Sequence, residues 1–235
     1  MNYLNLEEDG VTKFDGQNIY GYGNVRLVPH YYKYLIEPEA HGKTLLDIGC
    51  GDGVVGTLVQ DNVTYQGIDI GAGIYPEKPN HNVSYIRNYD DLLNEISNRE
   101  VDISMLINVL EHTFDFTGLF ETALKSTKNT VVVALPNEEN IHNRLDFLFG
   151  GGIKTHTLDL VGQHVNHRHL WLIQIPKAVK ALNAVAHKYG FTLSTKVNYI
   201  AYPNTLWKRV LYKIGMVFLP WTLKARNFVL VFKKS

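Results

Sequence analysis

The chain has 235 residues, of which 45% are apolar and 20% charged, so it is long enough to bury one substantial core. Its N-terminus has neither the basic start nor the apolar core of a signal peptide, and no uncharged apolar run approaches the roughly 18 residues that span a bilayer. The single cysteine, Cys50, excludes an internal disulfide and a cysteine-clustered zinc site. We therefore expect a cytoplasmic protein with one domain.

The formal net charge is zero, but the charges are divided unevenly along the chain. Residues 1–159 hold all 23 acidic residues, whereas residues 160–235 hold 12 Lys and Arg residues and no acid. Such an asymmetry indicates an anionic partner, which would be a phosphate-bearing substrate, a nucleic acid or a membrane surface. The alternative is that the basic part packs on the acidic part of the same molecule.

The first half of the chain alternates buried strands with helices, which is typical of a parallel sheet covered by helices. A strand at Thr44–Ile48 leads through a glycine turn into a helix that begins near Val54. Helices are also predicted at Leu92–Ile96 and Phe116–Leu124. The remaining strands of this half are predicted at Tyr65–Ile70, Val83–Ile86, Asp102–Ile107 and Thr130–Leu135.

The second half of the chain does not continue this regular alternation of strands and helices. Asn137–Trp171 is long, polar and rich in Gly and His, which predicts a functional lid or a loop with short helices of its own. An amphipathic helix is predicted at Ile175–Tyr189. Two strands, at Phe191–Tyr199 and Asn227–Phe232, then flank an insertion at residues 200–226.

Three glycines, Gly49, Gly51 and Gly53, lie between the first predicted strand and its helix. Glycine lets a ligand approach the backbone closely, and the amides at a helix N-terminus favour negative charge. Asp69 ends the next strand, where it can accept hydrogen bonds from the two ribose hydroxyls of an adenosine. The run from Gly51 to Gly56 also matches the dinucleotide fingerprint G-x-G-x-x-G, so NAD is an alternative ligand.

Three features disfavour NAD. Asp47 puts a carboxylate where dinucleotide-binding folds usually carry an apolar residue. The turn begins with Gly-Cys-Gly directly after the strand, a short hinge that suits a methionine moiety better than a pyrophosphate. No recognisable second half follows that would hold a nicotinamide.

Four motifs occur in order between residues 44 and 137, namely LLDIGCGDG, YQGIDI, DISMLINVLEH and VVVALPN. This series resembles the class I S-adenosylmethionine-dependent methyltransferases, in particular their small-molecule branch. The resemblance implies an α/β, Rossmann-like fold with a seven-stranded, mostly parallel sheet, an antiparallel last strand, helices on both faces and lid insertions. It also implies S-adenosylmethionine as the cofactor, bound at the C-terminal ends of the strands.

The resemblance divides the single methyltransferase domain, residues 1–235, into four parts. These are an N-terminal cap at 1–43, a donor-binding core at 44–137, a lid at 138–171 and, at 172–235, the C-terminal part of the sheet with its 200–226 insertion.

The resemblance also assigns cofactor contacts residue by residue. Asn88 and Tyr89 stand where the family commonly has an acidic residue, so Asn88 would accept from the adenine amino group and Tyr89 would offer a stacking face. The full predicted cofactor set is Asp47, Gly49, Gly51, Gly53, Asp69, Ile70, Asn88, Tyr89, Asn108 and Val109.

Methyl transfer from a sulfonium is an in-line displacement that in some cases needs a base for the proton of the acceptor. Histidine suits this step, and the candidate bases are His112, just past the fourth strand, with His164 and His167 in the dense polar segment 163–171. A histidine that satisfies only local backbone groups is the alternative for His112. The candidate substrate-binding residues are Tyr20, Tyr22, Arg26, Arg168 and His169.

No metal site is expected, because H-x-x-H-x-H is a weak signature and no acid follows Asp159. Leu206–Ile214 within the insertion is a basic amphipathic segment that would be a pocket cap, a dimer face or a peripheral membrane contact. We expect a monomer or homodimer.

The function predicted from these observations is methyl transfer to an O or N atom of a small, anionic acceptor. Nucleic acid is not expected as the acceptor, since no Asn- or Asp-Pro-Pro-aromatic tetrapeptide occurs. Two alternatives stay open at this point. One is an NAD-dependent oxidoreductase, and the other is a membrane- or RNA-associated binding module with a vestigial donor site.

Overall fold

The computed structural model describes residues 2–8, 31–51, 53–71, 80–153, 156, 169–201 and 218–235. These residues form a sheet of eight strands in the order β1-β7-β8-β6-β5-β2-β3-β4. The strands are β1 (Asn2–Glu8), β2 (Thr44–Ile48), β3 (Thr64–Ile70), β4 (His81–Ile86), β5 (Val101–Ile107), β6 (Thr127–Pro136), β7 (Phe191–Ala201) and β8 (Asn227–Lys234).

The sheet is mostly parallel, with one reversed strand. Strands β4, β3, β2, β5 and β6 pair in parallel, and β8 runs antiparallel to both of its neighbours, β6 and β7. The seven-stranded sheet with an antiparallel last strand is therefore confirmed. One strand is additional, because β1 pairs in parallel with β7 from Asn2 opposite Thr195 to Glu8 opposite Ala201. No strand is predicted in this part of the cap, since main-chain pairing to a sheet edge is not visible as periodicity in the sequence.

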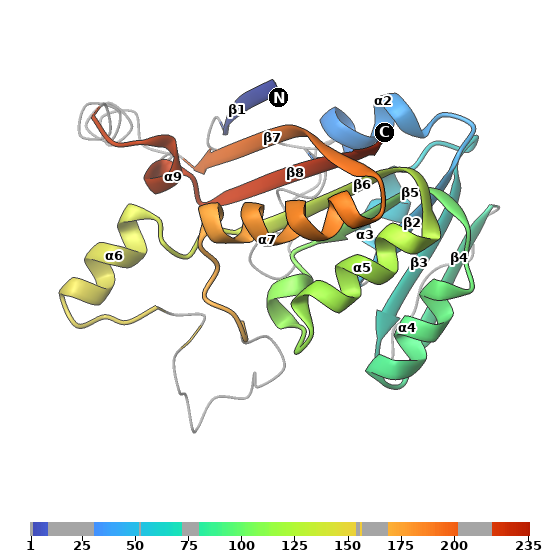
Figure 1. The fold of residues 1–235 in the computed structure, drawn as a ribbon, viewed down its shortest axis with the longest axis horizontal. Helices are drawn as coiled ribbons and strands as arrows, with labels where there is room; N and C mark the ends of the chain where they lie inside the picture. The colour runs from blue at the N-terminus through green and yellow to red at the C-terminus, as the bar shows by residue number, and fades with distance from the viewer. Residues whose placement is uncertain are drawn as a thin grey trace.

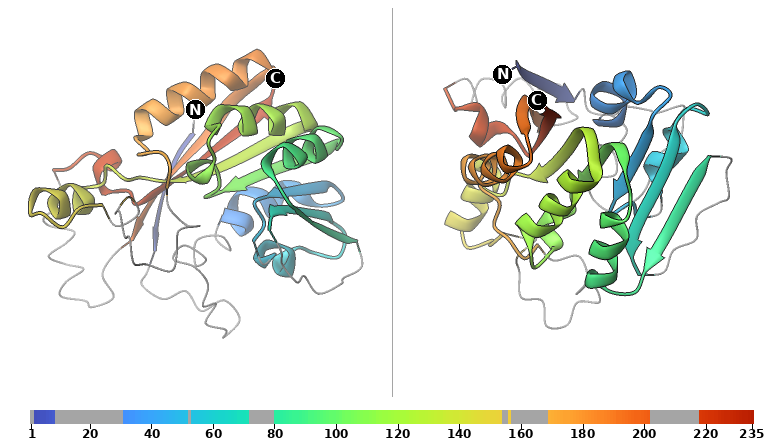
Figure 2. Two further views of the ribbon diagram at one scale, coloured as in Figure 1. Left: turned by 90° about the horizontal axis from the view of Figure 1, so that it is seen from below. Right: turned by 45° about the vertical axis from the view of Figure 1, so that its right-hand side comes forward.

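Helices cover both faces of the sheet (Figures 1 and 2). Three helices, α4 (Tyr89–Ser97), α5 (Phe116–Ser126) and α7 (Ile175–Lys188), lie side by side on one face. Their apolar side chains pack with those of the strands into one cluster that includes Leu92, Phe120 and Leu182. The other helical elements are η1 (Tyr32–Ile36), α2 (Glu37–Ala40), α3 (Val54–Leu58), η2 (Leu110–His112), α6 (Ile141–Leu148) and α9 (Trp221–Lys224).

A second apolar cluster lies on the opposite face, where Tyr31, Ile36 and Val55 pack against the strands. The central strands β5 and β6 are buried on both faces, which explains why they read as continuous apolar runs rather than alternating ones. The two clusters hold the strands rigidly, so that the loops at their C-terminal ends are fixed relative to one another.

Helix α6 differs from the helices on the sheet, because none of its 8 residues is buried. It stands away from the sheet in Figure 1, and Phe147, Leu148 and Phe149 at its end are 70%, 73% and 82% exposed. Within the described parts of the chain, no helix has the length and apolar content needed to cross a bilayer.

Candidate functional site

The glycine loop follows β2 and contains three residues with left-handed backbones, at φ +75° for Gly49, +52° for Gly51 and +71° for Gly53. A Cβ on Gly49 would lie 2.3 Å from Cγ2 of Val109, so this position needs glycine for steric reasons as well. A Cβ on Gly51 would meet nothing within 4 Å. The loop thus packs tightly on one side and is open on the other, where a ligand can approach the backbone.

Asp69 is tied to this loop. Its Oδ2 accepts a hydrogen bond of 2.5 Å from the amide of Gly51, and its Oδ1 accepts one of 2.6 Å from the amide of Ile70. The hydroxyl of Tyr85 donates to the carbonyl of Gly51 at 3.2 Å. The carboxylate that ends β3 is therefore held beside the open glycine, as a ribose-binding acid requires.

Asp47 lies beneath the loop and is only 3% exposed. The hydroxyl of Tyr65 donates to its Oδ2 at 2.7 Å. Burial raises the pKa of Asp47 to about 7, the hydrogen bond from Tyr65 opposes this rise, and the charge of Asp69 adds to it.

The strand-end segment after β5 begins with Asn108, whose backbone is left-handed at φ +54°. Its amide donates to the carbonyl of Ala134 at 2.9 Å, which fixes the segment to β6. Its buried Oδ1 has no hydrogen-bond partner among the residues that the structure describes. Asn108 and Asp47 thus offer hydrogen-bond acceptor oxygens near the glycine loop. Such oxygens suit a ligand that carries positive charge.

The residues predicted to meet the adenine have structural partners already. Asn88 caps α4, since its Oδ1 accepts from the amide of Asp91 at 2.9 Å and its Nδ2 donates to that carboxylate at 2.6 Å. The hydroxyl of Tyr89 donates to the carbonyl of Asp115 at 3.2 Å, and burial raises the pKa of Tyr89 to about 12. Contact of Asn88 and Tyr89 with an adenine stays a prediction.

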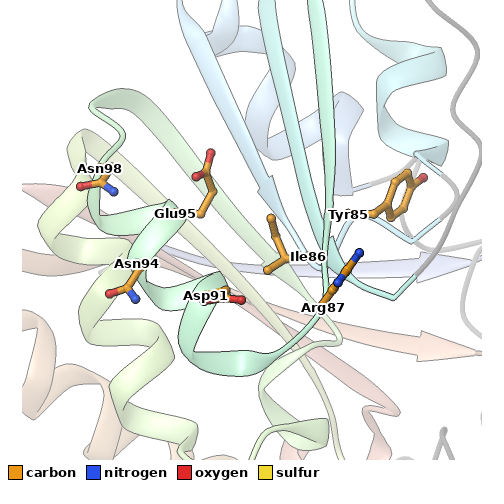
Figure 3. A pocket seen from close by; sticks show the side chains of 7 residues that line it. All are labelled: Tyr85, Ile86, Arg87, Asp91, Asn94, Glu95 and Asn98. Atoms are coloured by element: carbon orange, nitrogen blue, oxygen red, sulfur yellow. The ribbon is translucent and has the colours of Figure 1, made fainter.

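A polar hollow of about 410 Å³ lies between the end of β4 and α4. Figure 3 shows its lining, which consists of Tyr85, Ile86, Arg87, Asp91, Asn94, Glu95 and Asn98. Its lining does not include the glycine loop, Asp47 or Asp69, but Tyr85 links it to the loop through its hydrogen bond to the carbonyl of Gly51.

A cluster of two glutamates and three histidines lies beyond the ends of β5 and β6, and we call it the His–Glu cluster. Its centre is Glu138, which is 3% exposed. The Glu138 carboxylate is hydrogen-bonded to Nδ1 of His169 at 2.6 Å and to Nε2 of His156 at 2.8 Å, and it accepts from the amide of Ile173 at 2.9 Å. The members of the cluster are Glu111, His112, Glu138, His156 and His169.

Two further members come from η2, directly after β5. The ring of His112 meets the ring of His169 edge-on, with 4.8 Å between centroids. Glu111 is fully buried, and neither of its carboxylate oxygens has a hydrogen-bond partner among the described residues. Burial raises the pKa of Glu111 to about 8, the residue's own backbone amide opposes this rise, and the charge of Glu138 adds to it.

The segment that carries His169 is clamped to η2. The amide of Leu170 donates to the carbonyl of Glu111 at 2.7 Å, and the indole of Trp171 donates to the carbonyl of Thr113 at 2.7 Å. His169 is therefore held beside His112 by main-chain contacts as well as by Glu138.

The structure brings two predicted residues together in this cluster, namely His112, expected as a base, and His169, expected as a substrate contact. The predicted cofactor residues at the strand ends gather around the glycine loop. Several predictions fall outside the described residues. These are Tyr20, Tyr22, Arg26, His164, His167, Arg168 and the whole basic amphipathic segment 206–214.

Glu111, Glu138 and His156 are site residues that the sequence patterns did not predict. A signal for the two glutamates was available, because each follows closely on a predicted parallel strand and the ends of such strands meet at one edge of a sheet. His156 had no comparable signal.

The strand order, the reversed β8, the glycine loop and the acid that ends β3 together define a class I, Rossmann-like methyltransferase that uses S-adenosylmethionine. Comparison with known proteins agrees with this class. The model of the family described as "Methyltransferase domain" matches residues 22–196. The chain therefore belongs to the methyltransferase-domain family. The ligand of the glycine loop is accordingly S-adenosylmethionine and not NAD.

Solved structures share the fold at low sequence identity. A methyltransferase from Archaeoglobus fulgidus has 17% identity and a TM-score of 0.57, over 90% of this chain and 95% of that one. Magnesium protoporphyrin IX methyltransferase from Synechocystis PCC 6803 has 11% identity and a TM-score of 0.56, over 90% and 84% of the two chains. A methyltransferase from Listeria monocytogenes has 13% identity and a TM-score of 0.52, over 91% and 100%. No protein of curated function matches the sequence significantly.

Proposed function

We propose that the enzyme transfers a methyl group to an oxygen or nitrogen atom of a small, anionic acceptor, and that the His–Glu cluster receives the acceptor's proton. The observation that carries this proposal is the hydrogen bond between Glu138 and Nδ1 of His169, beside the ring of His112. Oxygen and nitrogen acceptors release a proton when they are methylated, and a histidine oriented by a carboxylate is suited to accept it.

The donor side of the reaction depends on the residues around the glycine loop. S-adenosylmethionine, when bound, supplies a methyl group on a positively charged sulfur. Gly51 leaves room for the ligand, Asp69 binds the ribose, and the acceptor oxygens of Asp47 and Asn108 favour the positive charge. Val109 contacts Gly49 and lies three residues before His112, so the donor loop and the His–Glu cluster are neighbours along the same strand end.

The hydrogen bond to Glu138 determines which nitrogen of His169 acts as a base. A carboxylate at Nδ1 favours the tautomer with its proton on Nδ1, which leaves the lone pair of Nε2 to accept a proton. The imidazolium that forms is stabilised by the negative charge of Glu138. Glu138 is a positioning residue in this scheme, and His169 or the adjacent His112 is the base.

The anionic character of the acceptor is supported by positive charge on the same side of the fold. The amide of Asn137, next to Glu138, donates to the carbonyl of Arg226 at 2.6 Å. Burial lowers the pKa of His142, and the charge of Arg226 lowers it further. The charge of Asp146 opposes that of Arg226 at His142, and residues 160–235, which include Arg226, hold 12 Lys and Arg residues and no acid.

A matched panel of acceptors tests the proposal. Hydroxy- and amino-acids bearing a carboxylate or phosphate would be compared with their neutral esters in a methyl-transfer assay, beside calorimetric titration with S-adenosylhomocysteine. We expect a higher kcat/KM for the anionic member of each pair, and loss of turnover with retained S-adenosylhomocysteine binding in His169→Ala. Preference for the neutral esters, or unchanged turnover in both His169→Ala and His112→Ala, would contradict it.

A further inference from the structure

We infer that the His–Glu cluster is a binding site for a divalent transition-metal ion, with Glu111, His112 and His169 as its ligands and Glu138 as the residue that orients His169. One ligand atom from each of the three proposed ligands lies within 4.8 Å of the others. A metal site is not predicted from the sequence, because no acid follows Asp159. The fold supplies acids from earlier in the chain, at the ends of β5 and β6.

Glu111 is the strongest indication of a missing ligand. Its side chain is fully buried, and both of its carboxylate oxygens lack a hydrogen-bond partner within the described part of the chain. Buried polar groups in proteins are nearly always paired, and buried carboxylates are paired with a cation or bind a metal. A metal ion between Glu111 and the two histidines would satisfy both oxygens.

His169 is held in the manner typical of a metal ligand. Histidine ligands usually donate their other ring N–H to a carboxylate or carbonyl, which fixes the tautomer and the direction of the lone pair. Nδ1 of His169 makes such a hydrogen bond with Glu138 at 2.6 Å, so Nε2 is the nitrogen that remains for a metal.

A second combination of residues, Glu138 with His156 and His169, also has its candidate ligand atoms within 4.8 Å of one another. We assign Glu138 to the orienting role instead, because its carboxylate already has three partners, namely His169, His156 and the amide of Ile173. Binding a metal through Glu138 would break one of these hydrogen bonds, whereas binding through Glu111 breaks none that the structure contains among described residues.

The ligand types determine the class of metal. Two imidazoles and one carboxylate suit Zn²⁺, Co²⁺ or another first-row transition metal, whereas Mg²⁺ and Ca²⁺ prefer oxygen ligands. Zinc bonds of about 2.1 Å put tetrahedral ligand atoms roughly 3.4 Å apart. Small rotations of His112 and Glu111 would therefore close the site around the ion, and three protein ligands leave a position open for the acceptor.

This assignment has a consequence for the reaction, which rests on the proposed function. With a metal bound, His169 and His112 are ligands and no longer accept the proton, so their role as base applies to the metal-free enzyme. The metal would instead make a bound acceptor hydroxyl acidic enough to release its proton to water, and it would position an anionic acceptor. Metal binding itself does not depend on the identity of the acceptor, so the two proposals can be tested separately.

The test uses the full chain, treated with a chelator and then dialysed, with S-adenosylhomocysteine present. Zn²⁺ is titrated by calorimetry, and Co²⁺ is followed by its visible absorption, which reports tetrahedral coordination. We expect one bound ion per chain, and a loss of affinity of at least roughly tenfold in Glu111→Gln, His169→Ala and Glu138→Gln. His187→Ala is the matched control, because His187 is an exposed histidine of α7, and its affinity should equal that of the wild type.

Two results would overturn the metal site. One is absence of Zn²⁺ and Co²⁺ binding by a wild-type protein that still binds S-adenosylhomocysteine. The other is wild-type metal affinity in Glu111→Gln and His169→Ala, which would assign the ion to surface histidines. If a variant loses S-adenosylhomocysteine binding as well, the wild-type Co²⁺ spectrum decides, since a spectrum identical to that of aqueous Co²⁺ contradicts the proposed ligand set. Failure of the proposed function is a different result, namely a bound metal without preference for anionic acceptors.

Discussion

Nδ1 of His169 lies 2.6 Å from Oε1 of Glu138, which joins the two ends of the predicted lid, 138–171, just beyond the end of β6. The two residues are 31 positions apart in the chain. This contact fixes both the position and the tautomer of His169 next to His112. The acceptor side of the enzyme is thus organised by a buried carboxylate rather than by the histidines alone.

Removing the charge of Glu138 should slow the reaction without affecting the cofactor. In Glu138→Gln, we expect kcat to fall about 10- to 100-fold, because His169 loses its orienting carboxylate. The KM for S-adenosylmethionine should stay unchanged, and the pH–rate profile should move, since the basicity of His169 depends on that carboxylate. Steady-state kinetics across pH measure both effects. Glu100→Gln is the control, at a glutamate whose side chain is 76% exposed, and equal behaviour of the two variants would exclude a role for Glu138.

Gly49 and Gly42 separate steric contact from backbone strain. Both have left-handed backbones, at φ +75° and +68°, but only a Cβ on Gly49 would collide with Val109. Gly42→Ala should therefore lower the free energy of unfolding only through backbone strain, by on the order of 1 kcal/mol. Gly49→Ala should lower the free energy of unfolding by a larger amount, and the variant should also bind S-adenosylhomocysteine weakly. Urea denaturation and calorimetry measure the two quantities, and equal losses in both variants would refute the assigned contact.

Asp69→Ala tests the ribose contact. We expect S-adenosylhomocysteine affinity to fall by at least roughly tenfold, because a charge-assisted hydrogen bond to a hydroxyl contributes about 1.5–3 kcal/mol. Asp61→Ala, at an exposed aspartate in the turn before β3, is the control and should bind normally. Normal affinity in Asp69→Ala would show that the ribose is held elsewhere.

Asp47 should make the stability of the ligand-free enzyme depend on pH. Its folded pKa of about 7 is above the ordinary value of 3.8, so the folded state holds a proton that the unfolded state releases between these values. Stability is therefore greatest below pH 3.8 with respect to this group and falls as the pH rises to about 7. Asp47→Asn should flatten that fall. Thermal melting at both ends of the range measures it, and an unchanged slope in Asp47→Asn would contradict the raised pKa.

Truncation of a buried and of an exposed phenylalanine compares the contributions of the core and of α6 to stability. Phe120 is fully buried between α5 and the sheet, whereas Phe147 on α6 is 70% exposed. Phe120→Ala should lower the unfolding free energy by about 3–5 kcal/mol, and Phe147→Ala should change it by less than about 0.5 kcal/mol. Urea denaturation compares them, and a large loss in Phe147→Ala would mean that α6 packs on a partner in solution.

Local sequence patterns were sufficient for the donor half of the protein. Strands β2, β5 and β6 are mostly buried runs bounded by turn residues, so their positions are encoded within a few residues. The glycine loop is equally local, because the left-handed backbones of Gly49, Gly51 and Gly53 exclude most other residues. Asn88 was harder to interpret, since an asparagine is equally suited to capping a helix and to binding an adenine, and the sequence does not distinguish the two roles.

The sequence by itself determined the fold class, the cofactor and the position of the donor loop, because these depend on short-range periodicity and on motifs within one strand and its turn. Only the tertiary structure decided the composition of the His–Glu cluster. Glu111, Glu138, His156 and His169 come from segments separated along the chain. The two glutamates meet because the parallel strands β5 and β6 pair and end at the same edge of the sheet, and the two histidines join them through hydrogen bonds to Glu138.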